Sequence, residues 1–208
     1  MNPDQISRFH VPELHELPAD IRSKIEAVQE KSGFIPNVFL ALAHRPDEWR
    51  AFFAHHDALM ERDSGLSKAE REMIVVATSA TNDCHYCVIA HGAILRIRAK
   101  NSLLADQLAI GYRKADLSDR ERRIVEFSLK VAAGSGELEE ADLQAMRTAG
   151  FSDDEICLLL RSFFRRGYGS SRLPEPLRHW LGHMGAVCAT KGSRREGSPR
   201  RDLPKTQQ

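Results

Sequence analysis

Residues 66–99, LSKAEREMIVVATSATNDCHYCVIAHGAILRIRA, contain the pattern that decides the fold. Ser67 stands three residues before Glu70, the spacing of a capping box at the start of a helix. The apolar run that follows ends at Asn82 and Asp83, and either of these residues is suited to cap a second helix. The stretch therefore predicts two consecutive helices joined by a short turn.

The rest of the chain has the pattern of further helices, separated by short segments that contain Gly, Pro, Asn and Asp. The alternation of aromatic and β-branched residues that is typical of strands is almost absent. The sequence therefore predicts an all-α fold, a helical bundle. The other predicted helices cover residues 18–31, 37–43, 46–62, 102–111, 118–133, 139–149 and 152–166.

The chain divides into a helical part and a tail. One helical domain is predicted for residues 1–166, with residues 66–99 as its core motif. From about residue 167 onward, Gly, Pro, Ser, Arg and Lys accumulate, and residues 191–208 contain almost nothing to bury. Residues 167–208 are therefore predicted to form a basic C-terminal tail that is partly disordered.

Two segments of the helical part resemble each other. Residues 66–72 and 117–123 share the pattern Leu-Ser-x-x-Glu-Arg, lie 51 residues apart, and each precedes an apolar helix. They are interpreted either as a degenerate internal repeat or as two helices that merely share a capping box. The second copy has Arg123 where the first has Glu72, and it contains no cysteine pair. Any chemistry is therefore expected in the first copy.

The overall composition excludes several classes of protein. The chain has 208 residues, 42% of them hydrophobic and 28% charged, with a formal net charge of +1. Binding to nucleic acid or to an anionic membrane is not expected from a charge so close to balance. The N-terminal stretch MNPDQISRFHVPELHELP lacks the apolar core of a secretory signal, and no apolar run is long enough to span a bilayer. A cytoplasmic location is therefore expected.

The number and spacing of the cysteines agree with a cytoplasmic location. Four cysteines in a chain of this length are too few for a disulfide scaffold. In a reducing compartment, a close pair such as Cys84 and Cys87 is typical of a catalytic or metal-binding site rather than a structural disulfide.

The chemistry is expected in the pattern Glu72-x11-Cys84-x2-Cys87-x3-His91. On a helix that begins near residue 83, the two cysteines are three residues apart and the histidine follows four residues later, so all three share one face. The two sulfur atoms are then close enough to form a disulfide after a modest adjustment of the backbone.

These residue types fit thiol chemistry. The N-terminus of a helix stabilises a thiolate, which is the form that attacks a peroxide oxygen or a disulfide sulfur. We expect His91 to accept the thiol proton of Cys87, and a carboxylate to orient the imidazole. Glu72 lies in an apolar helix, where a carboxylate is costly without a partner, which favours a role for it in this relay.

Two alternative classes of function remain open at this point. One is a zinc-stabilised binding or scaffold protein, although structural zinc sites usually draw ligand pairs from two segments, and the chain has no second CxxC or HxxxH. Its ligands would be Cys84, Cys87 and His91, with a fourth from Glu72, His55, His56 or His85. The other, implied only by the family resemblance described below, is a lactone or decarboxylase activity without redox chemistry, as in relatives that lack the cysteine pair, and the presence of both cysteines here argues against it.

Residues 72–92, EMIVVATSATNDCHYCVIAHG, resemble the core motif of the alkylhydroperoxidase AhpD-like proteins of the carboxymuconolactone decarboxylase superfamily. The lead-in LSKAERE and the segment GFIPNVF at residues 33–39 are similar to the peroxidase-related branch. The resemblance covers roughly residues 20–157, and its Glu-x11-CxxCxxxH spacing is quite specific.

The resemblance implies an AhpD-like all-α bundle with peroxiredoxin-type alkylhydroperoxidase activity, an antioxidant function. On this basis Cys87 is the peroxidatic thiolate, Cys84 resolves the sulfenic acid as a redox-active disulfide, and Glu72 and His91 form the proton relay. The implied partners are a hydrogen or organic peroxide, an external dithiol or disulfide-reductase donor, and further copies of the chain in a dimer, trimer or hexamer. No haem, flavin or metal cofactor is implied.

The sequence departs from the family pattern in two places. Well-known members have a histidine directly before the second cysteine, where this chain has Tyr86, and His85 stands one position earlier. Both are kept as auxiliary site residues, while a packing role for Tyr86 and a solvent-facing His85 are the simpler interpretations. From about residue 158 the sequence also loses the family's long apolar helix. No chemistry is assigned to Cys157 or Cys188.

Overall fold

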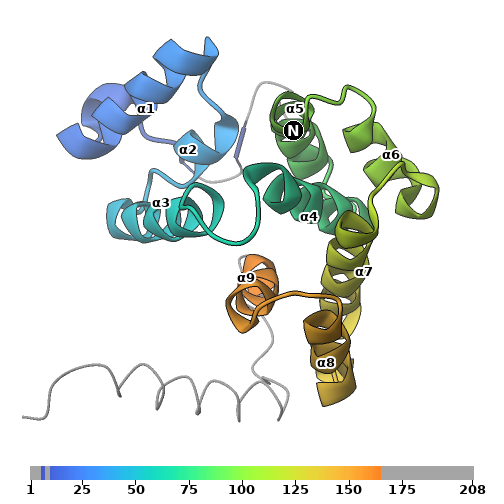
Figure 1. Ribbon diagram of the computed structural model, residues 1–208. Coiled ribbons are helices and arrows are strands. Elements are labelled where there is room, and N and C mark those ends of the chain that lie inside the picture. Colours follow the sequence, from blue (N-terminus) through green and yellow to red (C-terminus); the bar gives the residue numbers. More distant parts are fainter. Residues whose placement is uncertain (1–5, 8–9, 165–208) are drawn as a thin grey trace, which may run out of the picture.

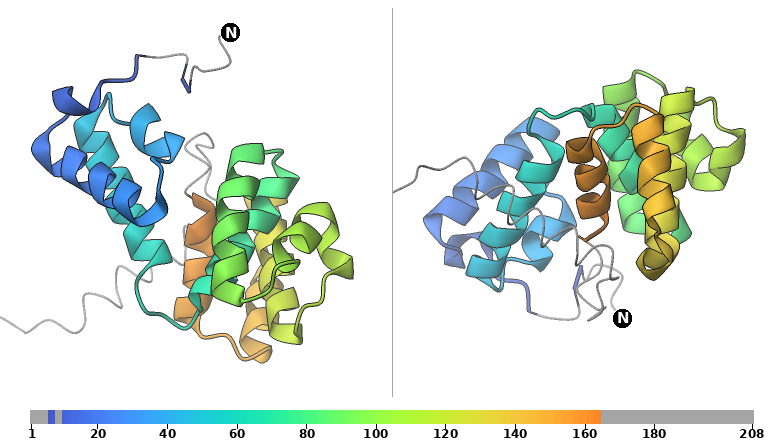
Figure 2. Two further views of the ribbon diagram at one scale, coloured as in Figure 1. Left: turned by 90° about the horizontal axis from the view of Figure 1, so that it is seen from above. Right: turned by 60° about the horizontal axis from the view of Figure 1, so that its bottom comes forward.

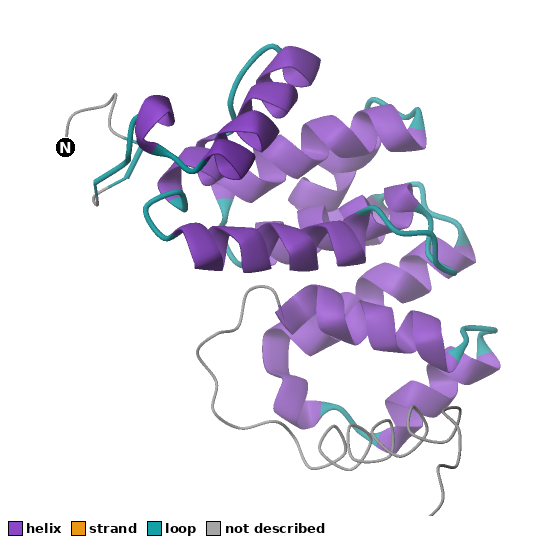
Figure 3. Cartoon of the chain, turned by 90° about the vertical axis from the view of Figure 1, so that its left-hand side faces the viewer, coloured by secondary structure: helices purple, strands orange, loops and turns teal. Residues whose placement is uncertain are grey.

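The computed structural model describes residues 6–7 and 10–164, and the regular structure in this part of the chain is all helical (Figure 3). The all-α prediction is confirmed, and the predicted helices lie close to their expected bounds. The α-helices are α1 (Ala19–Ser32), α2 (Asn37–Ala41), α3 (Pro46–Met60), α4 (Lys68–Thr81), α5 (His85–Ala99), α6 (Leu104–Gly111), α7 (Asp119–Gly134), α8 (Glu140–Thr148) and α9 (Asp153–Phe164). Within the described residues, three short 3-10 helices were not predicted: η1 (Leu14–Glu16), η2 (Tyr112–Lys114) and η3 (Ser135–Glu137). The predicted tail at residues 167–208, with Cys188, lies outside the described residues.

The helices form two groups (Figures 1 and 2). Helices α1 to α3 lie on one side of α4 and have a core of their own. Within this smaller group, the indole N–H of Trp49 on α3 donates to the carbonyl of Phe39 on α2 at 2.9 Å. Helices α4 to α9 form the larger group. The buried residues of the smaller core are Leu17, Ile21, Ile25, Ala43, Trp49 and Phe53.

Helix α4 is the centre of the molecule. It packs against α5, α6 and α7, and it also contacts α3 and α9. Every residue from Glu70 to Ser79 is buried, because neighbouring helices cover this helix on several sides. One cluster of buried residues joins α4 to α5, α6 and α7, and another joins it to α7, α8 and α9. Side chains on α4 are therefore held in fixed positions by neighbours on every side.

The buried hydroxyl groups of this helix have partners. The hydroxyl groups of Thr78 and Ser79 donate to the carbonyl oxygens of Ile74 and Val75 within the helix. Such local bonds satisfy a buried hydroxyl, which otherwise costs free energy. The charged residues at the start of α4 instead depend on side chains from other elements.

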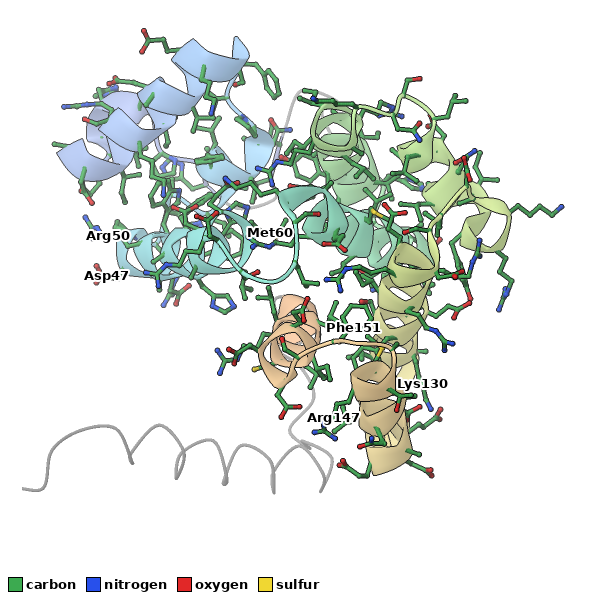
Figure 4. The ribbon with its side chains drawn as sticks, in the orientation of Figure 1. Asp47, Arg50, Met60, Lys130, Arg147 and Phe151 are labelled. Atoms are coloured by element: carbon green, nitrogen blue, oxygen red, sulfur yellow. The ribbon has the colours of Figure 1, made fainter. Side chains whose placement is uncertain are left out.

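Arg120 on α7 holds the start of α4 against α9. Its guanidinium donates to Glu70 and to Glu155, both at 2.7 Å, and lies 4.5 Å from the ring centroid of Phe151, labelled in Figure 4. Burial alone would raise the pKa of the Glu155 carboxyl, but hydrogen bonds from the N–H of Ser152 and from Arg120 lower it below its usual value. These contacts of Arg120 fix the N-terminal end of α4, which also carries Glu72.

The capping box predicted at Ser67 is present. The hydroxyl of Ser67 accepts from the N–H of Glu70, whose carboxylate accepts from the N–H of Ser67. The same reciprocal bonds occur between Ser118 and Glu121, and between Ser152 and Glu155. Because the motif recurs at α9, outside the proposed repeat, a shared capping box does not by itself identify a duplication. The internal repeat stays a prediction.

No helix within residues 6–7 and 10–164 is both long and apolar enough to cross a bilayer.

Candidate active site

The turn between α4 and α5 positions the first cysteine. Asp83 adopts a left-handed conformation with φ +52°, and the N–H of Cys84 donates to the carbonyl of Ser79 at 2.9 Å. The N–H of Asp83 donates to the carbonyl of Ala80, which completes a Schellman motif at the end of α4. Asp and Asn tolerate this conformation better than other non-glycine residues. The chain therefore reverses between the two helices within three residues.

Cys84 is itself the N-cap of α5, which corrects the expectation that Asn82 or Asp83 would cap this helix. Asn82 is the C-cap of α4, and Asp83 is used by the turn. The first helical hydrogen bond of α5 runs from the N–H of Val88 to the carbonyl of Cys84. Cys84, as the N-cap, and Cys87, in the first turn, thus both lie at the N-terminus of a helix, where its partial positive charge favours anions.

Cys84 and Cys87 have their sulfur atoms 2.7 Å apart and are not joined by a disulfide. A disulfide bond measures about 2.05 Å, so the two sulfurs are close but not bonded. Both residues are partly exposed, which leaves them accessible to a small molecule. The predicted proximity of the two cysteines is confirmed.

His91 on α5 and Glu72 on α4 form a largely buried pair. The Nδ1 atom of His91 lies 2.7 Å from Oε2 of Glu72, and the two side chains are 13% and 2% exposed. An ionised carboxylate only accepts hydrogen bonds, so Nδ1 carries the proton of this bond and the neutral imidazole keeps Nε2 as an acceptor. The expectation that the carboxylate of α4 points at this histidine of α5 is confirmed.

Three further charged residues extend this pair, and the sequence analysis missed them. Nη1 of Arg98 lies 3.1 Å from the other oxygen of Glu72, and Nη2 lies 2.6 Å from Oε1 of Glu61. Lys68 binds the second oxygen of Glu61 at 2.9 Å. Burial would raise the pKa of Glu61, but hydrogen bonds from Lys68 and Arg98 lower it below its usual value. The i, i+7 spacing of His91 and Arg98 was the only available signal, and it is too common to single out Arg98.

The two auxiliary residues lie at the edge of the site. The N–H of Val38 on α2 donates to the hydroxyl of Tyr86 at 3.4 Å, which connects the start of α5 to the smaller helical group. His85 is exposed. Cys157 lies on α9 and is buried, and burial raises the pKa of its thiol, so it is not expected to react as a thiolate.

The geometry gives no support to the zinc alternative. Among the residues that the structure describes, no three His, Cys, Asp or Glu side chains are grouped so that they can hold a metal ion. Cys84, Cys87 and His91 share a face of α5 without forming such a group. The arrangement instead combines two adjacent thiols with an imidazole that a carboxylate orients.

Comparison with known proteins gives a consistent result. The family model described as "Carboxymuconolactone decarboxylase family" matches residues 46–109, which include all four predicted site residues. A solved structure from Ralstonia eutropha JMP134, described as an alkylhydroperoxidase AhpD core and an uncharacterized peroxidase-related protein, is 53% identical. It matches with a TM-score of 0.76 over 86% of this chain and 90% of that one. An uncharacterized peroxidase-related protein from Silicibacter sp. TM1040 is 32% identical, with a TM-score of 0.74 over 91% of this chain and 93% of that one. No curated protein matches significantly.

Proposed function

The chain belongs to the AhpD-like proteins of the carboxymuconolactone decarboxylase superfamily, and from this premise we propose that it is a thiol-dependent peroxidase. Its substrates are hydrogen peroxide or small organic peroxides, and its reactive groups are Cys87 and Cys84. The observation that carries the proposal is the pair of cysteines at the start of α5, whose sulfurs lie 2.7 Å apart without a disulfide. The peroxidase-related description of both similar structures supports the same reaction class.

The first half of the reaction oxidises Cys87. Its thiol proton passes to Nε2 of His91, and the imidazolium is stabilised by Glu72. The thiolate attacks one peroxide oxygen, so that an S–O bond forms as the O–O bond breaks. The leaving alkoxide or hydroxide takes the proton from His91 and departs as alcohol or water, which leaves a sulfenic acid on Cys87.

The second half restores the enzyme. The sulfur of Cys84 attacks the sulfur of Cys87, the S–O bond breaks, and the hydroxide leaves as water with the proton of Cys84. This step is intramolecular because both cysteines belong to one chain, and the short distance between their sulfurs favours it. An external dithiol then reduces the disulfide by thiol–disulfide exchange and supplies two electrons and two protons.

A steady-state assay tests the proposal. Purified protein is expected to consume hydrogen peroxide and an alkyl hydroperoxide at a rate proportional to enzyme concentration when dithiothreitol is the donor. Enzyme treated with iodoacetamide before the assay serves as the control, because alkylation blocks both thiols. A rate no faster than that of the alkylated control would exclude the peroxidase assignment.

We also propose that the protein associates with itself through the outer face of α5. Tyr86, Ile89 and Ile97 are 45%, 72% and 77% exposed on this face. Exposed apolar patches of this kind mark association surfaces, and the same patch on two copies is self-complementary across a two-fold axis. The face begins beside Cys87, so a second copy would lie next to the site.

Light scattering after size-exclusion chromatography tests this association. We expect the wild-type protein to elute as an oligomer and Ile97→Glu to dissociate at least tenfold more readily, because the change places a charge in an apolar contact. Phe34→Glu is the matched control, since it makes the same kind of change at a side chain that is 61% exposed on the smaller helical group. A wild-type monomer at micromolar concentration would contradict the proposal.

A further inference from the structure

Arg98 faces the side of Glu72 that His91 leaves open. Seven residues separate His91 and Arg98 on α5, which places them two turns apart on one face. Their side chains converge on the same carboxylate, His91 at 2.7 Å from one oxygen and Arg98 at 3.1 Å from the other. The proton relay assigned above uses only one of these two contacts.

The second contact matters because Glu72 is almost completely buried. Its side chain is 2% exposed, and a buried carboxylate is strongly disfavoured as an anion unless a positive charge lies beside it. A neutral imidazole cannot provide that charge, whereas a guanidinium is always protonated. Nη1 of Arg98 is within ion-pair distance of Glu72 but makes no hydrogen bond, so its effect here is mainly that of its charge.

The surrounding charges keep Arg98 in this position. Glu61 binds the other terminal nitrogen of Arg98 at 2.6 Å, and Lys68 binds Glu61 from the opposite side. Arg71, the residue before Glu72 on α4, is buried but donates to the hydroxyl of Ser64 and the carbonyl of Leu66. Of the three cations Arg71, Lys68 and Arg98, Arg98 is the one that forms an ion pair with Glu72.

We infer that Arg98 is a positioning residue that compensates the charge of the Glu72 carboxylate and holds it aimed at His91, and so sets the reactivity of the Cys87 thiol. This inference rests on the proposed function, since the role of Arg98 in the cell would be to support peroxide reduction. The effect of Arg98 on the Cys87 thiol can be measured without peroxide, because it concerns how readily Cys87 loses its proton. Without the positive charge, the buried carboxylate of Glu72 loses its compensating partner and stabilises the imidazolium of His91 less well, so less Cys87 thiolate forms at a given pH.

The test compares Arg98→Gln, Arg98→Lys and Arg96→Gln as full-length reduced proteins. Arg96 is the matched control, since it lies on the same helix and pairs with Asp106 on α6 at 2.8 Å instead of with Glu72. The rate of alkylation of Cys87 by iodoacetamide is measured by mass spectrometry from about pH 5 to pH 9. Steady-state peroxide turnover is measured on the same preparations.

We expect Arg98→Gln to lower the alkylation rate at neutral pH about tenfold and to move the midpoint of its pH profile upward by about one unit. Arg98→Lys is expected to recover most of this loss because it keeps the charge, and Arg96→Gln is expected to match the wild type. An Arg98→Gln profile that coincides with that of Arg96→Gln would overturn the inference, as would equal losses in Arg98→Gln and Arg98→Lys without a shift in midpoint. Absence of peroxide turnover in the wild type, with the alkylation shifts intact, would instead refute the peroxidase proposal alone.

Discussion

Replacing Cys87 with serine is expected to reduce kcat/KM for peroxide by at least about a thousandfold. Serine is nearly isosteric with cysteine, so the first turn of α5 is expected to keep its geometry. The hydroxyl, however, does not ionise near neutral pH and does not attack the O–O bond. The loss should therefore appear in the chemical step, with the thermal unfolding temperature almost unchanged.

Two further cysteine variants serve as comparisons for this result. Cys157→Ala removes a buried thiol on α9 and is expected to leave turnover unchanged. Cys84→Ser is expected to reduce peroxide once per chain, after which the sulfenic acid on Cys87 persists and can be trapped with dimedone. Turnover by Cys87→Ser at the wild-type rate would exclude the assigned nucleophile.

The second large effect is expected from Glu72→Gln, which should lower kcat/KM by about a hundredfold to a thousandfold. A neutral amide neither stabilises the imidazolium of His91 nor compensates the charge of Arg98. Because the site is buried, loss of one partner of the ion pair is also expected to lower the free energy of unfolding by about 3 kcal/mol. Rates and denaturant unfolding are measured on the same samples.

Glu70→Gln separates the effect on activity from the effect on stability. Glu70 lies on the same helix, is 11% exposed at its side chain, and pairs with Arg120 instead of with a site residue. This variant is expected to lose stability but to retain turnover. Equal losses of activity in Glu70→Gln and Glu72→Gln would show that Glu72 has only a structural role.

Much of the fold follows from local patterns. The capping box at Ser67 and the apolar run after it predict α4, because the hydrogen bonds involved lie within four residues in sequence. The helical spacing of Cys84, Cys87 and His91 likewise predicts that they share a face. The proximity of Glu72 to His91 was inferred from the cost of burying its charge, and the 2.7 Å contact between them confirms it.

The features that were missed depend on tertiary contacts. Arg98 forms an ion pair with Glu72, which lies 26 residues earlier in the chain, and no local spacing predicts such a contact. Tyr86 binds the backbone of Val38 across 48 residues, which depends on how the two helical groups pack. The choice of Cys84 over Asp83 as the N-cap follows from the left-handed turn at Asp83, a conformation that the sequence permits but does not require.

The most direct test of the account is the product of one reaction with peroxide. Reduced protein is mixed with one equivalent of hydrogen peroxide, blocked with iodoacetamide and digested with trypsin. Residues 72–96 then form a single peptide that carries both Cys84 and Cys87. The account predicts that this peptide loses two hydrogen atoms and takes up no alkyl group, while Cys157 becomes alkylated once the protein is unfolded. A peptide with both cysteines still alkylated, or with Cys87 oxidised to a sulfinic acid and Cys84 alkylated, would contradict it.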